Sequence, residues 1–176
     1  RLRNVHLDFS SIAKGYAIDL VHKALLSDIS IKSHYVELGG EIRTSLMKLK
    51  DTPWVVGIEN PQNPNKAVLE LRSNLLQEFS IATSGDYRNF RVDDGEAFSH
   101  TINTKTGKPK RFSKSSITVL SETAMKADAL ATALNAMKLE KAIHYSNEND
   151  INAVFLTNQN GKVHLIFSKS MAKIVK

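Results

Sequence analysis

Two oxygen-bearing side chains, Asp128 and Thr132, are the first feature of this sequence that could support chemistry. They lie in residues 123–137, T-A-M-K-A-D-A-L-A-T-A-L-N-A-M, a segment dominated by the strong helix formers alanine, leucine and methionine. In a helix, their i, i+4 spacing puts the carboxylate and the hydroxyl on one face. Both are hard oxygen donors of the kind that Mg²⁺ or Ca²⁺ prefers. The same segment also fits a packing helix whose Asp128 and Thr132 face water, so on its own it leaves both interpretations open.

Lys14 is the second candidate, because it stands in the first turn of a predicted helix that Ser10 or Ser11 can cap. A cation in this position is mildly unfavourable beside the helix dipole. It makes better sense if an anion binds between the lysine and the helix N-terminus, and a solvated surface lysine is the alternative. Gly15 costs about 1 kcal/mol in a helix relative to alanine, which indicates close approach by a neighbouring helix or a ligand.

The histidine spacing and the absence of cysteine limit the kinds of metal site and catalytic nucleophile that the chain can form. None of the six histidines shows metal-ligand spacing, and a chain without cysteine can form no disulfide, thiolate metal site or cysteine nucleophile. The sequence also contains no nucleophile elbow, P-loop or dinucleotide-binding fingerprint. His100 differs from the other histidines because it precedes T-I-N-T-K-T-G, a polar turn with small residues.

The composition is that of an ordinary globular protein. The residues are 41% hydrophobic and 24% charged. A length of 176 residues is enough for one domain with a hydrophobic core. The net charge of +6 favours anionic partners. Apart from a cluster in residues 105–114, however, the basic residues are scattered and no nucleic-acid-binding motif accompanies them, so we expect no nucleic acid partner. No apolar run approaches membrane-spanning length, and no signal peptide precedes the first predicted strand.

The elements that must position these residues are runs of strands interrupted by a few helices. Helices are predicted at residues 12–26, 123–137 and 139–146. Strands are predicted at residues 5–9, 33–38, 41–43, 54–59, 67–72, 78–83, 87–92, 98–103, 116–120, 153–157 and 163–167. The apolar stripe of the first helix is predicted to follow Ile12, Tyr16, Leu20 and Ala24. This order indicates an α+β architecture rather than a doubly wound sheet, and we expect a single domain over residues 1–176.

Five segments resemble, in order and spacing, motifs of the ApbE family, the FAD:protein FMN transferases. D-F-S-S-I-A-K-G-Y-A-I-D at residues 8–19 resembles the family's L-D-L-G-G-I-A-K-G-Y-A-V-D, and V-E-L-G-G-E-I at 36–42 resembles N-L-G-G-D-I. I-A-T-S-G-D-Y at 81–87 and H-T-I-N-T-K-T-G at 100–107 resemble S-G-D-Y and H-I-I-D-P-R-T-G. A-M-K-A-D-A-L-A-T-A-L at 124–134 resembles the block that holds the family's metal.

The resemblance implies an α+β fold of the T-fold-like kind, with antiparallel sheets, that binds FAD as substrate beside Mg²⁺, or Ca²⁺ in its place. It implies transfer of FMN from FAD to a Thr or Ser hydroxyl of an acceptor flavoprotein subunit, with release of AMP. Two alternatives are an FAD pyrophosphatase, which yields FMN and AMP, and a non-catalytic flavin-binding or interaction module. Family members are mostly exported lipoproteins. We therefore expect a periplasmic protein, or one held at the inner membrane by a lipid anchor outside this chain.

The resemblance also implies roles for individual residues. Carried over residue by residue, it places the metal on Asp128, Thr132 and an oxygen of Ser11. It makes His100 the general base for the incoming hydroxyl or water.

Three further residues are implied to contact FAD: Asp8, Lys14 near the pyrophosphate, and Ile102 in the flavin pocket.

The sequence departs from the family pattern at residues 10–11, Ser-Ser in place of a glycine pair, and at 103–104, Asn-Thr in place of Asp-Pro. Family members are nearly twice this long, and we expect the chain to lack their N-terminal region.

Overall fold

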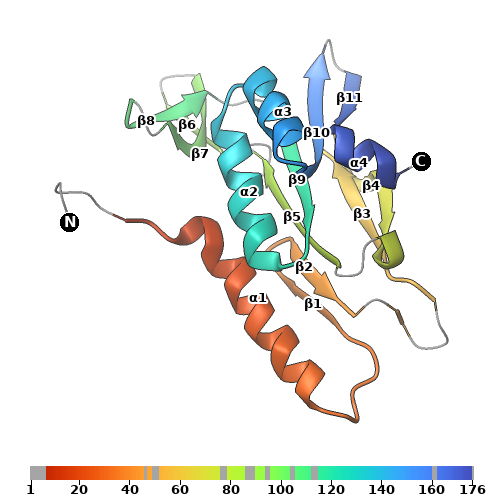
Figure 1. The fold of residues 1–176 in the computed structure, drawn as a ribbon. Coiled ribbons are helices and arrows are strands. Elements are labelled where there is room, and N and C mark those ends of the chain that lie inside the picture. The colour runs from red at the N-terminus through yellow and green to blue at the C-terminus, as the bar shows by residue number, and fades with distance from the viewer. Residues whose placement is uncertain are drawn as a thin grey trace.

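An antiparallel sheet of six strands, in the order β1-β2-β5-β9-β10-β11, forms the centre of the computed structural model (Figure 1). The structure describes residues 7–45, 47–48, 52–75, 79–85, 90–93, 96–103, 106–111, 115–159 and 162–175. The strands of this sheet are β1 Tyr35–Leu38, β2 Glu41–Thr44, β5 Phe79–Gly85, β9 Ser116–Ser121, β10 Asn152–Gln159 and β11 Lys162–Phe167. Every neighbouring pair in this order is antiparallel. The α+β prediction is therefore confirmed.

Alternation of side chains along the central strands gives the sheet two apolar faces. On β10, Phe155 joins a core that includes helices α2 (Ala124–Ala136) and α3 (Leu139–Glu148), while its neighbour Val154 joins a second core. The second core includes Val56 of strand β3 (Val55–Asn60) and Met171 of helix α4 (Lys169–Ile174). Each face is therefore covered by a different layer.

The remaining strands form two smaller sheets beside the central one (Figure 1). One is the hairpin of β3 Val55–Asn60 and β4 Asn63–Arg72, which a 3₁₀ turn at Ser73–Leu75 follows. The other contains β6 Phe90–Asp93, β7 Glu96–Asn103 and β8 Lys108–Arg111. Strand β8 and helix α4 were not predicted from the sequence, whereas each of the other strands overlaps a predicted one. In the described part of the chain, no helix is both long and apolar enough to cross a membrane.

Helix α2 confirms the prediction of a helix at residues 123–137. It lies against β5 and β9, and the Thr123 hydroxyl caps its start by accepting a hydrogen bond from the Lys126 amide at 3.2 Å. This is the N-cap arrangement that stabilises a helix by about 1 kcal/mol.

Helix α1, Ser10–Ser27, crosses α2 at very short range (Figure 1). A Cβ atom added to Gly15 would lie 2.3 Å from the carbonyl oxygen of Ala124, so only glycine fits at this crossing. One turn further along α1, the Asp19 carboxylate accepts hydrogen bonds from the amides of Ala124 and Met125 at 2.9 and 3.0 Å. The same carboxylate pairs with Arg43 of β2. Because these amides belong to the first turn of α2, Asp19 also complements the positive end of its dipole.

The predicted start of α1 is wrong. Of the strand expected at residues 5–9, residues 5 and 6 lie outside the described part, and residues 7–9 form no regular strand. The predicted cap at Ser10 or Ser11 is also wrong, because Ser10 is already the first helical residue and Phe9 takes the N-cap position without a side-chain hydrogen bond. The Asp8 carboxylate instead accepts a hydrogen bond from the Ser10 amide at 2.8 Å.

The predicted apolar stripe of α1 is wrong as well. Tyr16 and Leu20 are 53% and 51% exposed, and the residues that α1 buries are Gly15, Ile18 and His22. The helix packs through this side because the small Gly15 permits contact with α2. On the same side, the buried His22 ring lies 2.8 Å from His34, measured between ring nitrogens.

Gly15→Ala should destabilise the protein, although alanine is the better helix former by about 1 kcal/mol. The added methyl group must push α1 away from the Ala124 carbonyl, and we expect the free energy of unfolding to fall by about 2 kcal/mol or more. Urea denaturation measures this change. Ala13→Gly, at an exposed position on the same helix, is the control for helix propensity. An increase in stability for Gly15→Ala would contradict the close crossing.

Candidate functional site

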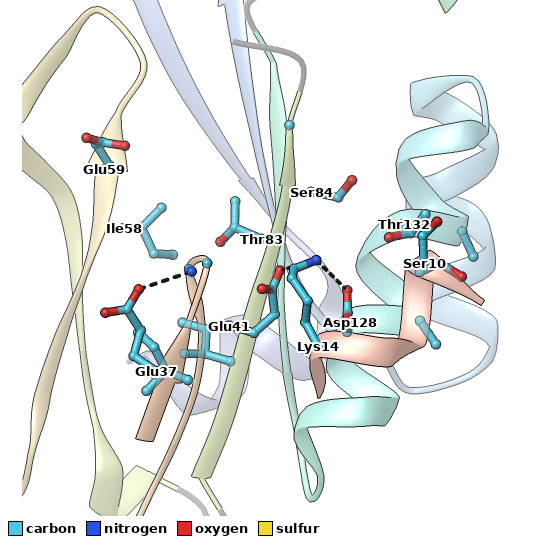
Figure 2. Close-up of a pocket in the computed structure, with 18 of the residues that line it drawn as sticks. Ser10, Lys14, Glu37, Glu41, Ile58, Glu59, Thr83, Ser84, Asp128 and Thr132 are labelled. Atoms are coloured by element: carbon cyan, nitrogen blue, oxygen red, sulfur yellow. Dashed lines mark hydrogen bonds and ion pairs between the residues drawn. The ribbon is translucent and has the colours of Figure 1, made fainter. Parts of the chain in front are cut away.

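A pocket of about 950 Å³ opens at the crossing of α1 and α2 (Figure 2). Its wall is built from the first turns of α1, the turn between β1 and β2, strands β3, β5 and β7, and the face of α2 from Asp128 to Ala136. This volume is near the upper end of the range for small-molecule sites. The pocket therefore brings together segments between Asp8 and Ala136 that lie far apart in the sequence.

Six of the seven residues singled out by the sequence line this one pocket: Asp8, Ser11, Lys14, Ile102, Asp128 and Thr132. The seventh, His100, lies in β7 two positions before Ile102. Its side chain is outside what the structure describes, so its catalytic role stays a prediction. The individual roles of the other six also stay predictions, but their shared location is a result of the fold.

Asp128 is held at the helix crossing and does not face water. The residue is 3% exposed, and its Oδ2 atom accepts a hydrogen bond from the Gly15 amide at 3.0 Å. Burial raises the pKa of Asp128, and the Gly15 amide and the Lys14 ammonium oppose this rise. Of the two interpretations that the sequence left open, the solvent-facing one is thus wrong for Asp128. Thr132, one turn later on α2, is half-buried and also lines the pocket.

Lys14 lies between two buried carboxylates (Figure 2). Its Nζ atom is 3.3 Å from Glu41 Oε1 and 3.8 Å from Asp128 Oδ1. The Lys14 side chain remains 42% exposed, so the ammonium group is paired on one side and open to the pocket on the other. The alternative of an isolated surface lysine is therefore wrong.

Glu41 is the residue of the site that sequence reasoning missed. Its side chain is 5% exposed, and burial raises its pKa to about 7, with Lys14 lowering it and Asp128 raising it further. Its Oε2 atom has no hydrogen-bond partner among the residues that the structure describes. The available signal was its place directly after the glycine pair at residues 39–40, because a turn without side chains lets a ligand approach the backbone.

The turn between β1 and β2 presents bare backbone to the pocket. Gly39 and Gly40 have φ angles of 62° and 98°, a left-handed region that glycine adopts at little cost. The Gly40 amide donates a hydrogen bond to Glu37 Oε1 at 3.1 Å, which holds the turn in shape. With no side chain at either position, a ligand can approach the main chain directly.

The donor atoms of the pocket suit a hard divalent cation. In the described ranges, no group of three His, Cys, Asp or Glu side chains gathers into a metal site. A cation here would therefore depend on one carboxylate, Asp128, together with the neutral oxygens of Ser11 and Thr132. Carboxylate and neutral oxygen donors are the ligands of Mg²⁺ and Ca²⁺, so the residues present fit such an ion.

Comparison with known proteins gives one consistent family. A family model described as "ApbE family" matches residues 1–155. The chain is 37% identical over 155 residues to the FAD:protein FMN transferase of Haemophilus influenzae, covering 88% of this chain and 44% of that protein. It is 39% identical over 147 residues to the Vibrio cholerae protein of the same name, covering 84% of this chain and 43% of the relative.

Solved structures give the same result. The apo form of the flavinyl transferase ApbE of Pseudomonas stutzeri superposes with a TM-score of 0.80 at 31% identity, over 97% of this chain and 51% of that one. The flavin transferase ApbE of Vibrio cholerae gives a TM-score of 0.75 at 32% identity, over 96% and 52% of the two chains. The chain thus spans about half the length of the relatives it matches.

Glu41→Gln should make the stability of the protein less dependent on pH. The folded state raises the pKa of Glu41 from 4.5 to about 7 and so binds this proton more tightly than the unfolded state does. The stabilisation from the bound proton is full below pH 4.5 and is lost as the pH rises to about 7. At about 1.4 kcal/mol per pKa unit, the loss is roughly 1–3 kcal/mol.

The measurement is urea denaturation in EDTA at pH 5 and pH 8. We expect the stability of Glu41→Gln relative to the unsubstituted protein to be higher at pH 8 than at pH 5. Glu122→Gln changes the same charge at an exposed position and is the control. An identical difference at both pH values for Glu41→Gln would show that the folded state does not perturb this carboxyl.

Proposed function

The chain belongs to the ApbE family, and on that premise we propose that it carries the FAD-binding and metal-binding part of an FAD:protein FMN transferase. The observation that carries this proposal is the meeting of Lys14, Ser11, Asp128 and Thr132 at one pocket, at the crossing of α1 and α2. Cleavage of a pyrophosphate bond requires groups that neutralise its negative charge. This pocket brings a cationic side chain together with oxygen atoms that could bind a metal cation.

Lys14 would bind the pyrophosphate of FAD. Its ammonium group is fixed at the pocket by Glu41 and Asp128 while part of the side chain stays exposed, so it can donate charge-assisted hydrogen bonds to phosphate oxygens. The glycine turn would let the rest of the ligand approach the main chain. The net charge of +6 favours an anionic substrate in general.

Asp128, Thr132 and Ser11 would hold a divalent cation, Mg²⁺ or Ca²⁺. Such an ion, when bound, neutralises negative charge on the phosphoryl group and polarises its oxygens. Asp128 is oriented for this role by the Gly15 amide on Oδ2, which leaves Oδ1 toward the pocket side on which Lys14 lies.

The proposed reaction is displacement at the phosphorus atom on the FMN side of FAD. The oxygen of a Thr or Ser hydroxyl of the acceptor protein forms the new bond to phosphorus, and the bond from that phosphorus to the bridging oxygen breaks. AMP leaves with the bonding electrons, and the proton of the hydroxyl passes to a general base, for which His100 is the candidate. With water in place of the hydroxyl, the same step yields FMN and AMP, which is the pyrophosphatase alternative.

Asp128→Asn should abolish cation-dependent chemistry on FAD. We expect formation of FMN and AMP to fall by roughly 100-fold or more, because the amide provides no charge for the cation, and cation-dependent FAD binding should be lost with it. Chromatography of the products and fluorescence titration of FAD, each with Mg²⁺ or with EDTA, measure the two effects. Glu122→Gln is the control, since it lies beside α2 but outside the pocket.

The two readouts separate the possible functions. AMP release that requires an acceptor protein supports the transferase, and AMP release without one supports the pyrophosphatase. FAD binding that yields no product in either case would leave a flavin-binding module. Undiminished turnover in Asp128→Asn would refute the cation assignment.

Lys14→Ala should weaken FAD binding and leave riboflavin binding unchanged. A charge-assisted hydrogen bond to phosphate is worth about 1.5–3 kcal/mol, so the Kd for FAD should rise by roughly 10- to 100-fold. Riboflavin carries no phosphate and tests the same flavin pocket without this contact. Lys23→Ala, at an exposed position on the same helix, controls for the loss of one positive charge. Equal weakening for both ligands would contradict the pyrophosphate role.

A further inference from the structure

The Lys14 ammonium group lies where a cation bound to Asp128 would have to compete with it (Figure 2). Asp128 Oδ2 is already occupied by the Gly15 amide at 3.0 Å, so Oδ1 is the oxygen toward which Lys14 turns, at 3.8 Å. Two positive charges cannot share this oxygen without strong repulsion in a buried site. Binding of a divalent cation to Asp128 therefore requires another place for Lys14.

Glu41 provides that place. The Lys14 Nζ atom is already closer to Glu41 Oε1, at 3.3 Å, than to Asp128 Oδ1. Glu41 is also strongly dependent on Lys14, because its side chain is 5% exposed and its Oε2 atom has no hydrogen-bond partner within the described part of the protein. A buried carboxylate with so few partners gains much from a neighbouring ammonium group.

The backbone fixes Glu41 relative to Lys14. Glu41 begins β2 and pairs with Leu38 of β1, and the next residue, Ile42, pairs with Ile81 of β5, so the carboxylate extends from a strand inside the central sheet. The stem of Lys14 lies along the adjoining turn, with its Cδ atom 3.4 Å from where a Cβ on Gly39 would be. The ammonium group can thus move between Asp128 and Glu41 while its stem stays in place.

We propose that Glu41 is a positioning residue that draws the Lys14 ammonium group away from Asp128, so that a divalent cation can use Asp128 while Lys14 stays available to the phosphates of FAD. The inference rests on the proposed function, because it takes the cation site at Asp128 as its starting point. It adds a role for a residue of β2 that touches neither the cation nor the reacting atoms.

The test is a double-mutant cycle on cation affinity, measured for the 176-residue chain without flavin. Binding of Mn²⁺, as a probe for divalent cations, is followed by the electron paramagnetic resonance signal of the free ion at pH 8. The proteins are the unsubstituted chain, Glu41→Gln, Lys14→Met and the double variant, with Glu122→Gln as the control for loss of one exposed carboxylate. Circular dichroism and thermal melting establish that each variant is folded.

We expect Glu41→Gln to weaken Mn²⁺ binding by about tenfold, because Lys14 then pairs with Asp128, and we expect Lys14→Met to strengthen it. In the Lys14→Met background, Glu41→Gln should change the affinity by no more than about twofold, since no ammonium group remains to be positioned. Equal effects of Glu41→Gln in both backgrounds would mean that Glu41 acts only through its charge, and this would overturn the inference. Glu41→Asp keeps the carboxylate and should retain more affinity than Glu41→Gln.

A crystal structure of Glu41→Gln gives a second, independent readout. The inference requires the Lys14 Nζ atom to lie within hydrogen-bonding distance of Asp128 Oδ1 in this variant, and it fails if the side chain turns to solvent instead. Asp128→Asn in the Mn²⁺ assay separates the inference from the proposed function. If Asp128→Asn binds Mn²⁺ as well as the unsubstituted chain does, or if neither binds it, the cation site fails and the inference fails with it. If Asp128→Asn abolishes binding while the cycle is additive, only the role of Glu41 is refuted.

Discussion

The close contact between α1 and α2 is the constraint on which the site depends. The backbone of Gly15 lies against the Ala124 carbonyl with no room for a Cβ atom, and the Asp19 carboxylate closes the contact by accepting the first amides of α2. Because the helices approach so closely, the Gly15 amide reaches Asp128 and fixes one of its oxygens. A wider crossing would separate Lys14 from Asp128 and divide the pocket.

Much of the fold could be predicted from the sequence because its signals are local. The alanine-rich helix, the β9 and β10 strands and the α+β order follow from propensity and alternation. The predictions for α1 were wrong because contacts with other residues outweighed the local sequence pattern. The predicted stripe of α1 through Tyr16 and Leu20 is exposed, since packing on Gly15 decided which side of that helix is buried. The serine cap failed because the helix already begins at Ser10, with Phe9 at the N-cap position and its carbonyl oxygen accepting from the amides of Ile12 and Ala13.

The site was predictable as a set of residues and not as an arrangement. Asp128 and Lys14 carried signals of their own, one through helical spacing and the other through its unfavourable place near a helix start. The contact between these two residues depends on tertiary packing, which no local pattern encodes. Gly15 and Asp128, which share a hydrogen bond at the same place, are 113 residues apart in the sequence. Glu41 and the buried His22–His34 pair were missed for this reason, since their chemistry arises only from partners that the fold brings to them.

The pocket is lined partly by the crossing helices and partly by strands of the smaller sheets, and these two parts differ in how they tolerate substitutions. Lys14, Glu41 and Asp128 are joined by ion pairs, so a change in one of these residues disturbs the other two. Ile58 of the β3–β4 hairpin and Ile102 of β7 line the same pocket from small sheets outside this network. A substitution at Ile102, which is 47% exposed, can therefore change the shape of the pocket without breaking the ion pairs of Lys14.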